Sequence, residues 1–250
     1  MADPALETGQ RKLRDAAARL AWQAGRVAPP LDAAAWQDGL DLLAVAAGLK
    51  PVCLLGRGDV DPEWLAAARE VAAALDLAAR DGVGWLPAAP DDALPRWYRD
   101  ATAARLSRAP VVYLYAEPRL GAQVAALGTG ERVAAADEAA LLGYPFCCVA
   151  QHHTQTLALE QLTIALLARL AGDDTERLQR LVAAGVTPTP REPDEWRRFQ
   201  SVTAIDPEPF TSVNRCAACA ADANSPAQRL GRRYRALAAA LGYPLPQPAH

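Results

Sequence analysis

Two cysteine pairs that lie far apart in the sequence constrain the fold of this chain more than any other feature. The first pair, Cys147 and Cys148, lies within LGYPFCCVAQHH (142–153), and the second is the C-x-x-C of Cys216 and Cys219. The chain holds only 5 Cys and 3 His in 250 residues, so most of its sulfur ligands fall in these two short segments. Two residues between cysteines let both sulfurs face one centre, as in zinc and iron–sulfur sites. We therefore expect a fold that brings both segments to one metal centre.

The first pair is expected to begin a long helix, over about residues 146–170, after the proline at position 145. Cys148 and His152 are four residues apart and so share one face of this helix. His153 is expected to point away from Cys148 and to be partly exposed. The N-terminal end of a helix favours thiolate over thiol, and thiolate is the form that binds metals. His152 is therefore a candidate ligand or neighbour of the centre.

More than one kind of centre fits these residues. A closed tetrahedral zinc site can be made from four of them: Cys148, His152, Cys216 and Cys219. Adjacent cysteines bind different irons of a cluster more easily than one ion, because their Cβ atoms point in different directions. Including Cys147 therefore favours an iron–sulfur cluster slightly over zinc. Two interpretations without metal stay open: a dithiol redox pair, and buried free cysteines beside histidines that are solvated or cap the helix.

Residues 1–130 alternate between helical and strand patterns, which predicts an α/β part. Helices are expected over about 5–27, 31–48, 61–79 and 95–107. Short apolar runs predict three strands, PVCLLG (51–56), GVGWLPA (82–88) and PVVYLYA (110–116). Because helices separate the strands, we expect a small three-stranded parallel sheet with crossover connections. Cys53 lies inside the first strand, and we expect it in the core.

Residues 131–250 are expected to be mainly helical and to carry the cysteine pairs, either as a second part or as one compact unit with the first. The sequence LGYP occurs twice, at 142–145 and 241–244, each time after an alanine- and leucine-rich helical pattern. Glycine just past a helix with proline two residues on is typical of a helix end. We interpret the two copies as independent helix stops at Gly143 and Gly242.

The motifs of this half resemble those of a known family. LGYP followed by one residue and Cys-Cys, then a cysteine pair followed by Ser225, Gly231 and Tyr234, is similar to a domain-of-unknown-function family of archaea and bacteria. The resemblance covers about residues 134–241. The family's second pair is C-x-x-x-C, from which the C-x-x-C of this chain departs. The resemblance implies that the two cysteine pairs belong together, and it names no reaction.

Three other side chains of the second half have weaker patterns. Tyr144 and Tyr234 are candidates for lining the metal site, and ordinary packing explains them equally well. Glu160 lies on the long helix, where we expect it to form an exposed surface pair.

Composition excludes several classes of partner and location. The net charge is -3 and the pI is about 5.7, which gives no electrostatic basis for binding nucleic acid or an anionic membrane. The N-terminal segment has no secretory signal pattern, and no apolar run reaches the roughly 20 residues of a membrane span. We therefore expect a cytoplasmic protein, in which clustered cysteines are metal ligands or redox groups rather than structural disulfides.

These observations predict a cytoplasmic metalloprotein with an iron–sulfur or zinc centre held by four cysteines: Cys147, Cys148, Cys216 and Cys219. Such a centre could carry out redox or sulfur-transfer chemistry on a small-molecule substrate. Two other functions stay open. One is a non-catalytic binding or scaffold protein with a structural zinc site, and the other is a metal-free thiol–disulfide oxidoreductase.

Overall fold

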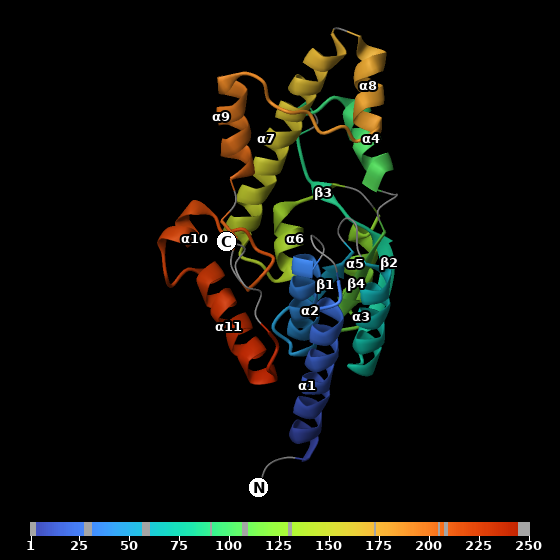
Figure 1. Ribbon diagram of the computed structural model, residues 1–250, viewed down its shortest axis with the longest axis vertical. Helices are drawn as coiled ribbons and strands as arrows, with labels where there is room; N and C mark the ends of the chain where they lie inside the picture. The colour runs from blue at the N-terminus through green and yellow to red at the C-terminus, as the bar shows by residue number, and fades with distance from the viewer. Residues whose placement is uncertain are drawn as a thin grey trace.

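Helices and short strands alternate in the first half of the chain, and helices alone follow (Figure 1). The computed structural model describes residues 4–27, 32–56, 61–90, 92–106, 110–129, 132–172, 174–204, 206–207 and 210–244. The elements of the first part are α1 (Pro4–Ala24), α2 (Asp32–Ala46), β1 (Val52–Leu55), α3 (Pro62–Ala74), β2 (Ala78–Val83), β3 (Leu86–Pro87), α4 (Arg96–Leu106), β4 (Pro110–Tyr115), α5 (Leu120–Leu127) and β5 (Arg132–Val133). Those of the second part are α6 (Ala135–Leu142), α7 (Phe146–Ala171), α8 (Thr175–Ala183), α9 (Pro193–Thr203), α10 (Ala217–Ala221) and α11 (Pro226–Leu241). None of the described helices is long and apolar enough to cross a membrane.

The three-stranded sheet has the order β1-β4-β2, and β4 runs antiparallel to both of its neighbours. The expected parallel pairing is therefore wrong, because β4 lies between the two strands that α3 connects. The expected strand at 82–88 is also divided in two. Its first residues end β2, which begins earlier, in the segment AARDGV, where no apolar run marks a strand. Its later residues form β3, which pairs in parallel with β5 in a separate two-stranded sheet.

Side-chain caps begin two of the helices. Asp61 accepts hydrogen bonds from the backbone N–H groups of Glu63 and Trp64, both at 2.9 Å, and Pro62 follows at the first helical position of α3. Ser225 accepts from the backbone N–H of Gln228 and is also followed by proline, which begins α11. These side chains satisfy N–H groups that have no partner within the helix.

Both LGYP copies end a helix with a left-handed glycine, as expected. Gly143 follows α6 with a φ of 69°, and Gly242 follows α11 with a φ of 66°. The two glycines differ in their surroundings. A Cβ atom added to Gly143 would lie 2.8 Å from Cδ of Pro51, whereas one added to Gly242 would meet nothing within 4 Å.

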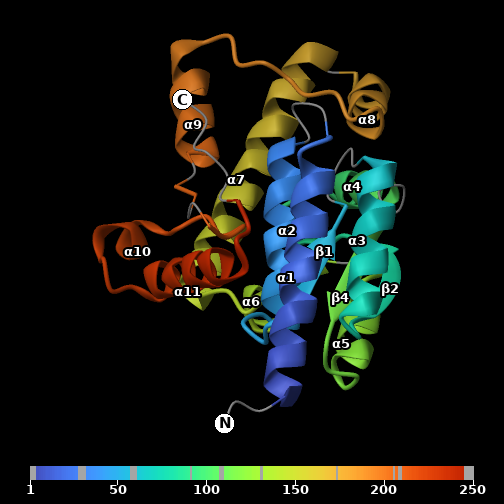
Figure 2. The same ribbon diagram turned by 60° about the horizontal axis from the view of Figure 1, so that its bottom comes forward.

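The sheet has a hydrophobic cluster on each face, because alternate strand residues point in opposite directions. Cys53 and Leu114 face a cluster built with α1, α2 and α3, which lie side by side in Figure 2. Leu54 and Tyr113 face the opposite cluster, which includes residues of α5 and α6. Cys53 is fully buried, as expected.

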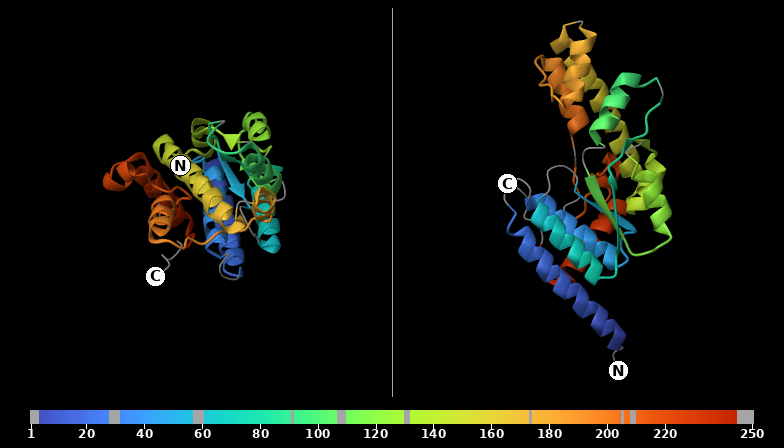
Figure 3. Two further views of the ribbon diagram at one scale, coloured as in Figure 1. Left: turned by 90° about the horizontal axis from the view of Figure 1, so that it is seen from above. Right: turned by 90° about the vertical axis from the view of Figure 1, so that its right-hand side faces the viewer.

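The first of these clusters joins the two parts of the chain. Besides α1, α2 and α3, it contains the buried cysteines of the second half together with Tyr234 and Ala238 of α11. A third cluster lies farther along α7, where α4, α8 and α9 gather at the end of the molecule opposite the N-terminus (Figures 1 and 3). The long helix α7 thus runs from the centre of the fold to this distal end.

Candidate metal centre

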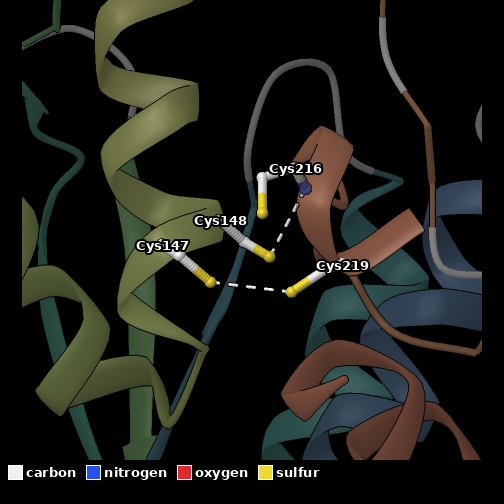
Figure 4. A group of neighbouring side chains, drawn as sticks. All are labelled: Cys147, Cys148, Cys216 and Cys219. Carbon is white, nitrogen blue, oxygen red and sulfur yellow. Dashed lines mark hydrogen bonds between the residues drawn. The ribbon is translucent and has the colours of Figure 1, made fainter. Parts of the chain in front are cut away.

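The fold brings the two cysteine pairs together. The ligand atoms of four cysteines lie within 4.8 Å of one another: Cys147, Cys148, Cys216 and Cys219. Figure 4 shows their sulfurs pointing toward one another across the gap between α7 and α10. We call this set the cysteine centre. A set of four sulfurs this close could hold a metal ion.

The first turn of α7 positions the first pair. Pro145 is the extended N-cap residue of the helix, with a φ of −61° and a ψ of 124°, and its carbonyl accepts from the N–H of Cys148 at 3.0 Å. Cys147 and Cys148 follow at the N-terminal end, where the partial positive charge of the helix stabilises a nearby thiolate. Both sulfurs reach the centre although the residues are adjacent in sequence.

The second pair lies on α10, a five-residue helix that leads into α11. Cys216 is its N-cap residue, and its N–H donates to Sγ of Cys148 at 3.5 Å. The hydroxyl of Ser225 donates to the carbonyl of Cys219 at 2.8 Å. Because Ser225 also caps α11, one side chain connects the cysteine-bearing helix to the last helix.

The centre is buried on one side and open on the other. Cys148, Cys216 and Cys219 are 2%, 5% and 3% exposed, whereas Cys147 is exposed to solvent. The difference follows from the helix, because successive residues lie about 100° apart around its axis. Phe146, one residue earlier, is 58% exposed. Solvent and reagents therefore reach the centre at Cys147.

The pKa values of Cys147, Cys148 and Cys219 are shifted in different directions. Partial desolvation by the neighbouring side chains raises the pKa of Cys147, and burial raises that of Cys148, where the Cys216 backbone N–H opposes the rise. Hydrogen bonds to the neighbouring thiols raise both pKa values further. Burial also opposes ionisation of Cys219, but hydrogen bonds from the Ala227 backbone and from the other three thiols lower its pKa overall. The surroundings of Cys219 thus favour its thiolate, whereas those of Cys147 and Cys148 favour the thiol. Thiolate is the form that binds metals, and a thiophilic metal ion fits this set of donors.

The histidines lie beside the centre rather than among its sulfurs. Within the described residues, the ligand set comprises the four cysteines without His152. His152 instead lines a cavity of about 100 Å³ next to Cys148, and its role as a ligand stays a prediction. His153 is buried, so the expectation that it is partly exposed is wrong. Its Nε2 lies 2.8 Å from Oε2 of Glu138, because α6 packs against that side of α7.

The wall of this cavity includes Tyr144 and Ser212, which belong to a hydrogen-bonded ring of four side chains. We call it the polar ring; its members are Asp41, Lys50, Tyr144 and Ser212. Nζ of Lys50 donates to Oδ2 of Asp41 at 2.8 Å and to the hydroxyl of Tyr144 at 2.5 Å. The hydroxyls of Tyr144 and Ser212 contact each other, and Ser212 donates to Oδ2 of Asp41 at 2.7 Å.

Electrostatics within the polar ring keep Lys50 charged although it is buried. Burial lowers the pKa of Lys50, but the Asp41 carboxylate and then Tyr144 raise it by more, so the net shift is upward. Burial raises the pKa of Tyr144, and Asp41 adds to this. Tyr144 is thus a neutral hydroxyl between a buried cation and the cavity beside Cys148, and it lines that cavity as expected.

Sequence patterns missed Asp41, Lys50 and Ser212. Asp41 follows Gly39-Leu40 and precedes two leucines. A charged residue within this apolar helix was the one sequence feature that could have indicated a buried polar group. The expectation for Glu160 is wrong. This carboxylate is buried and accepts two hydrogen bonds from the Arg132 guanidinium, at 3.0 and 2.7 Å. Arg132 follows the first half of the chain and is not marked by any motif.

No protein-family model, curated protein or solved structure matches this chain. The resemblance to the domain-of-unknown-function family therefore stays a prediction.

Proposed function

We propose that this chain is a metalloprotein whose cysteine centre binds one tetrahedral zinc ion. The observation that carries the proposal is the close spacing of the sulfurs. Four sulfurs at about 2.3 Å from one zinc ion lie about 3.8 Å apart in a regular tetrahedron. Sγ of Cys147 lies 3.6 Å from Sγ of Cys219, and all four ligand atoms lie within 4.8 Å of one another. In a four-iron cluster each thiolate binds a different iron, and in a two-iron cluster the two pairs of thiolates bind different irons, so at least some of the sulfurs lie farther apart.

The ion would join the first turn of α7 to α10, and through Ser225 to α11. Four protein ligands leave no open position on the ion, so this arrangement supports a stabilising role rather than chemistry at the metal. In a site of this kind the free energy of metal binding contributes to folding. Binding by four reduced thiolates requires a reducing compartment, and we therefore place the protein in the cytoplasm.

Anaerobic purification followed by elemental analysis tests this proposal. We expect one zinc per chain and no visible absorbance. Cys148→Ala and Cys219→Ala should each lower the zinc content strongly, whereas Cys53→Ala should retain it, because Cys53 is a buried cysteine outside the centre. Iron with inorganic sulfide and visible colour would contradict zinc and establish the cluster that the adjacent cysteines favour. A chain free of metal would contradict any metal centre.

A second function, thiol–disulfide exchange, is favoured by one pair of sulfurs. Cys147 is exposed, and its Sγ lies 3.6 Å from that of Cys219. In this reaction one thiolate attacks a disulfide substrate and releases one substrate thiol, and the second cysteine then attacks the mixed disulfide and releases the other. Two electrons and two protons pass to the substrate, which leaves as two thiols, and a Cys147–Cys219 disulfide remains.

Oxidised glutathione added to the metal-free protein tests this second function. Exchange predicts a Cys147–Cys219 disulfide, seen as crosslinked peptides by mass spectrometry and absent in Cys147→Ala. Formation of glutathione adducts on Cys147 without this crosslink would contradict it.

A further inference from the structure

A larger cavity lies along the middle of α7, away from the cysteine centre. Its volume is about 370 Å³, and α4, α7, α8, α9 and the segment after α8 surround it. This is the distal end of the molecule in Figure 1. Its wall includes Tyr98, Thr102, Leu159, Glu160, Leu166 and Phe199. The volume is within the range of natural small-molecule sites.

The hydroxyl of Tyr98 is the polar group that distinguishes this cavity. Tyr98 is 4% exposed, its ring packs edge-on against Trp97, and its backbone carbonyl accepts from the Thr102 hydroxyl. Within the described part of the chain no hydrogen bond reaches its hydroxyl. Because Tyr98 lines the cavity, a molecule bound there can supply the hydrogen-bond partner that a tyrosine hydroxyl normally has.

The charges around the cavity favour a neutral molecule. Glu160 contributes a carboxylate to the wall, but both of its oxygens accept from Arg132, which also donates to the carbonyl of Pro87 at 2.8 Å. The ion pair is thus internally neutralised. Arg105 also lines the cavity, but its side chain is exposed, and water screens its charge.

Tyr98 can act only as a hydroxyl under neutral conditions. Burial, and then the nearby Glu160 carboxylate, raise the pKa of Tyr98 to about 12. Its proton is therefore present to donate. Most of the remaining wall consists of leucine, valine and phenylalanine side chains and threonine methyl groups, which suit an apolar body.

We propose that this cavity binds a neutral, largely apolar molecule that carries an oxygen acceptor, and that the Tyr98 hydroxyl donates to that oxygen. The proposal goes beyond the metal centre. Cys148 and Glu160 are twelve residues apart on α7, which corresponds to about 18 Å along a helix. Loss of ligand binding in the cavity and loss of metal at the cysteine centre can therefore be observed separately.

Two probes that differ in one hydroxyl test the proposal: 2-naphthol and naphthalene, each measured by equilibrium dialysis against the purified full chain. Tyr98→Phe keeps the ring and removes only the donor. It should weaken 2-naphthol binding about 3- to 10-fold and leave naphthalene binding unchanged. Absence of saturable binding by 2-naphthol would overturn the proposal. So would a Tyr98→Phe variant that binds 2-naphthol as tightly as the native chain, or that loses both probes equally.

A cavity-filling variant tests whether the two probes bind in this cavity. Thr163 lines the cavity, and Thr163→Phe should abolish binding of both probes. Thr154→Phe is its matched control, because Thr154 lies on the same helix with an exposed side chain outside the cavity. Retained binding in Thr163→Phe, with an unchanged melting temperature, would overturn the proposal. Zinc content measured on each variant reports the cysteine centre separately.

Discussion

The two copies of LGYP share their local structure and differ in nearly everything around it. Each ends a helix with a left-handed glycine and presents a tyrosine directly after it. Tyr144 of the first copy enters the polar ring with a buried lysine and aspartate and leads into the cysteines. Tyr243 of the second copy packs edge-on against Trp36, with ring centroids 5.6 Å apart, and donates to its carbonyl at 3.0 Å. The shared LGYP sequence thus determines how each helix ends, but it does not determine which residues the helix end contacts.

Metal removal should give the largest difference between the copies. Zinc in a four-thiolate site contributes on the order of 10 kcal/mol to the folding of small domains. Treatment with a chelator should therefore speed amide exchange in the first turn of α7 and in α10, after the first copy. Exchange around Tyr243 should change least, because its contacts are with α2. Equal acceleration at both copies would show that the ion holds the whole fold rather than one junction.

Lys50→Ala should destabilise the protein next most strongly. It leaves Asp41 as a buried charge without its cation, which costs about 3–5 kcal/mol in comparable sites. Lys12→Ala is the matched control, because Lys12 pairs with Asp76 at the surface, where such pairs contribute about 0–1 kcal/mol. Urea unfolding monitored by circular dichroism measures both. Similar losses of unfolding free energy in the two variants would contradict a stabilising role for the buried polar ring.

The two copies can also be compared by adding a single Cβ atom to the glycine of each. A left-handed conformation costs an alanine about 1–2 kcal/mol, and Gly143→Ala and Gly242→Ala share this penalty. Only Gly143→Ala also forces a Cβ against Pro51, at 2.8 Å from its Cδ. It should therefore lower the free energy of unfolding by about 1–3 kcal/mol more than Gly242→Ala. Equal losses would mean that the segment around Pro51 moves aside without cost.

The predictable features of this protein are those that short sequence segments determine. Glycine after two helices and the spacing of the cysteines each act within a few residues, and each is found as expected. Strand direction was mispredicted because β2 has no apolar run and because β4 lies between two strands that are earlier in sequence. Local patterns carry no information on that order.

The surroundings of the cysteine centre were less predictable for a related reason. Tyr144 contacts Lys50, which is 94 residues away in sequence, and no motif connects them. His153 and Glu160 were expected to face solvent from their positions on one helix. They are buried because Glu138 and Arg132, from neighbouring elements, provide partners for them. Charged residues on a helix face therefore need their tertiary partners before their exposure can be assigned.

Removing the tyrosine hydroxyls should give the smallest difference between the copies, set by the charge of the group that each hydroxyl contacts. Tyr144→Phe removes a hydrogen bond from a buried ammonium group, and bonds to charged groups contribute about 1.5–3 kcal/mol. Tyr243→Phe removes a bond to a neutral carbonyl, which contributes about 0.5–1.5 kcal/mol. Urea unfolding of both variants should therefore show the greater loss for Tyr144→Phe, with zinc content unchanged because neither hydroxyl binds the ion. A greater loss for Tyr243→Phe would mean that Lys50 and Asp41 satisfy each other without Tyr144, and that the polar ring positions the wall of the cavity rather than stabilising the fold.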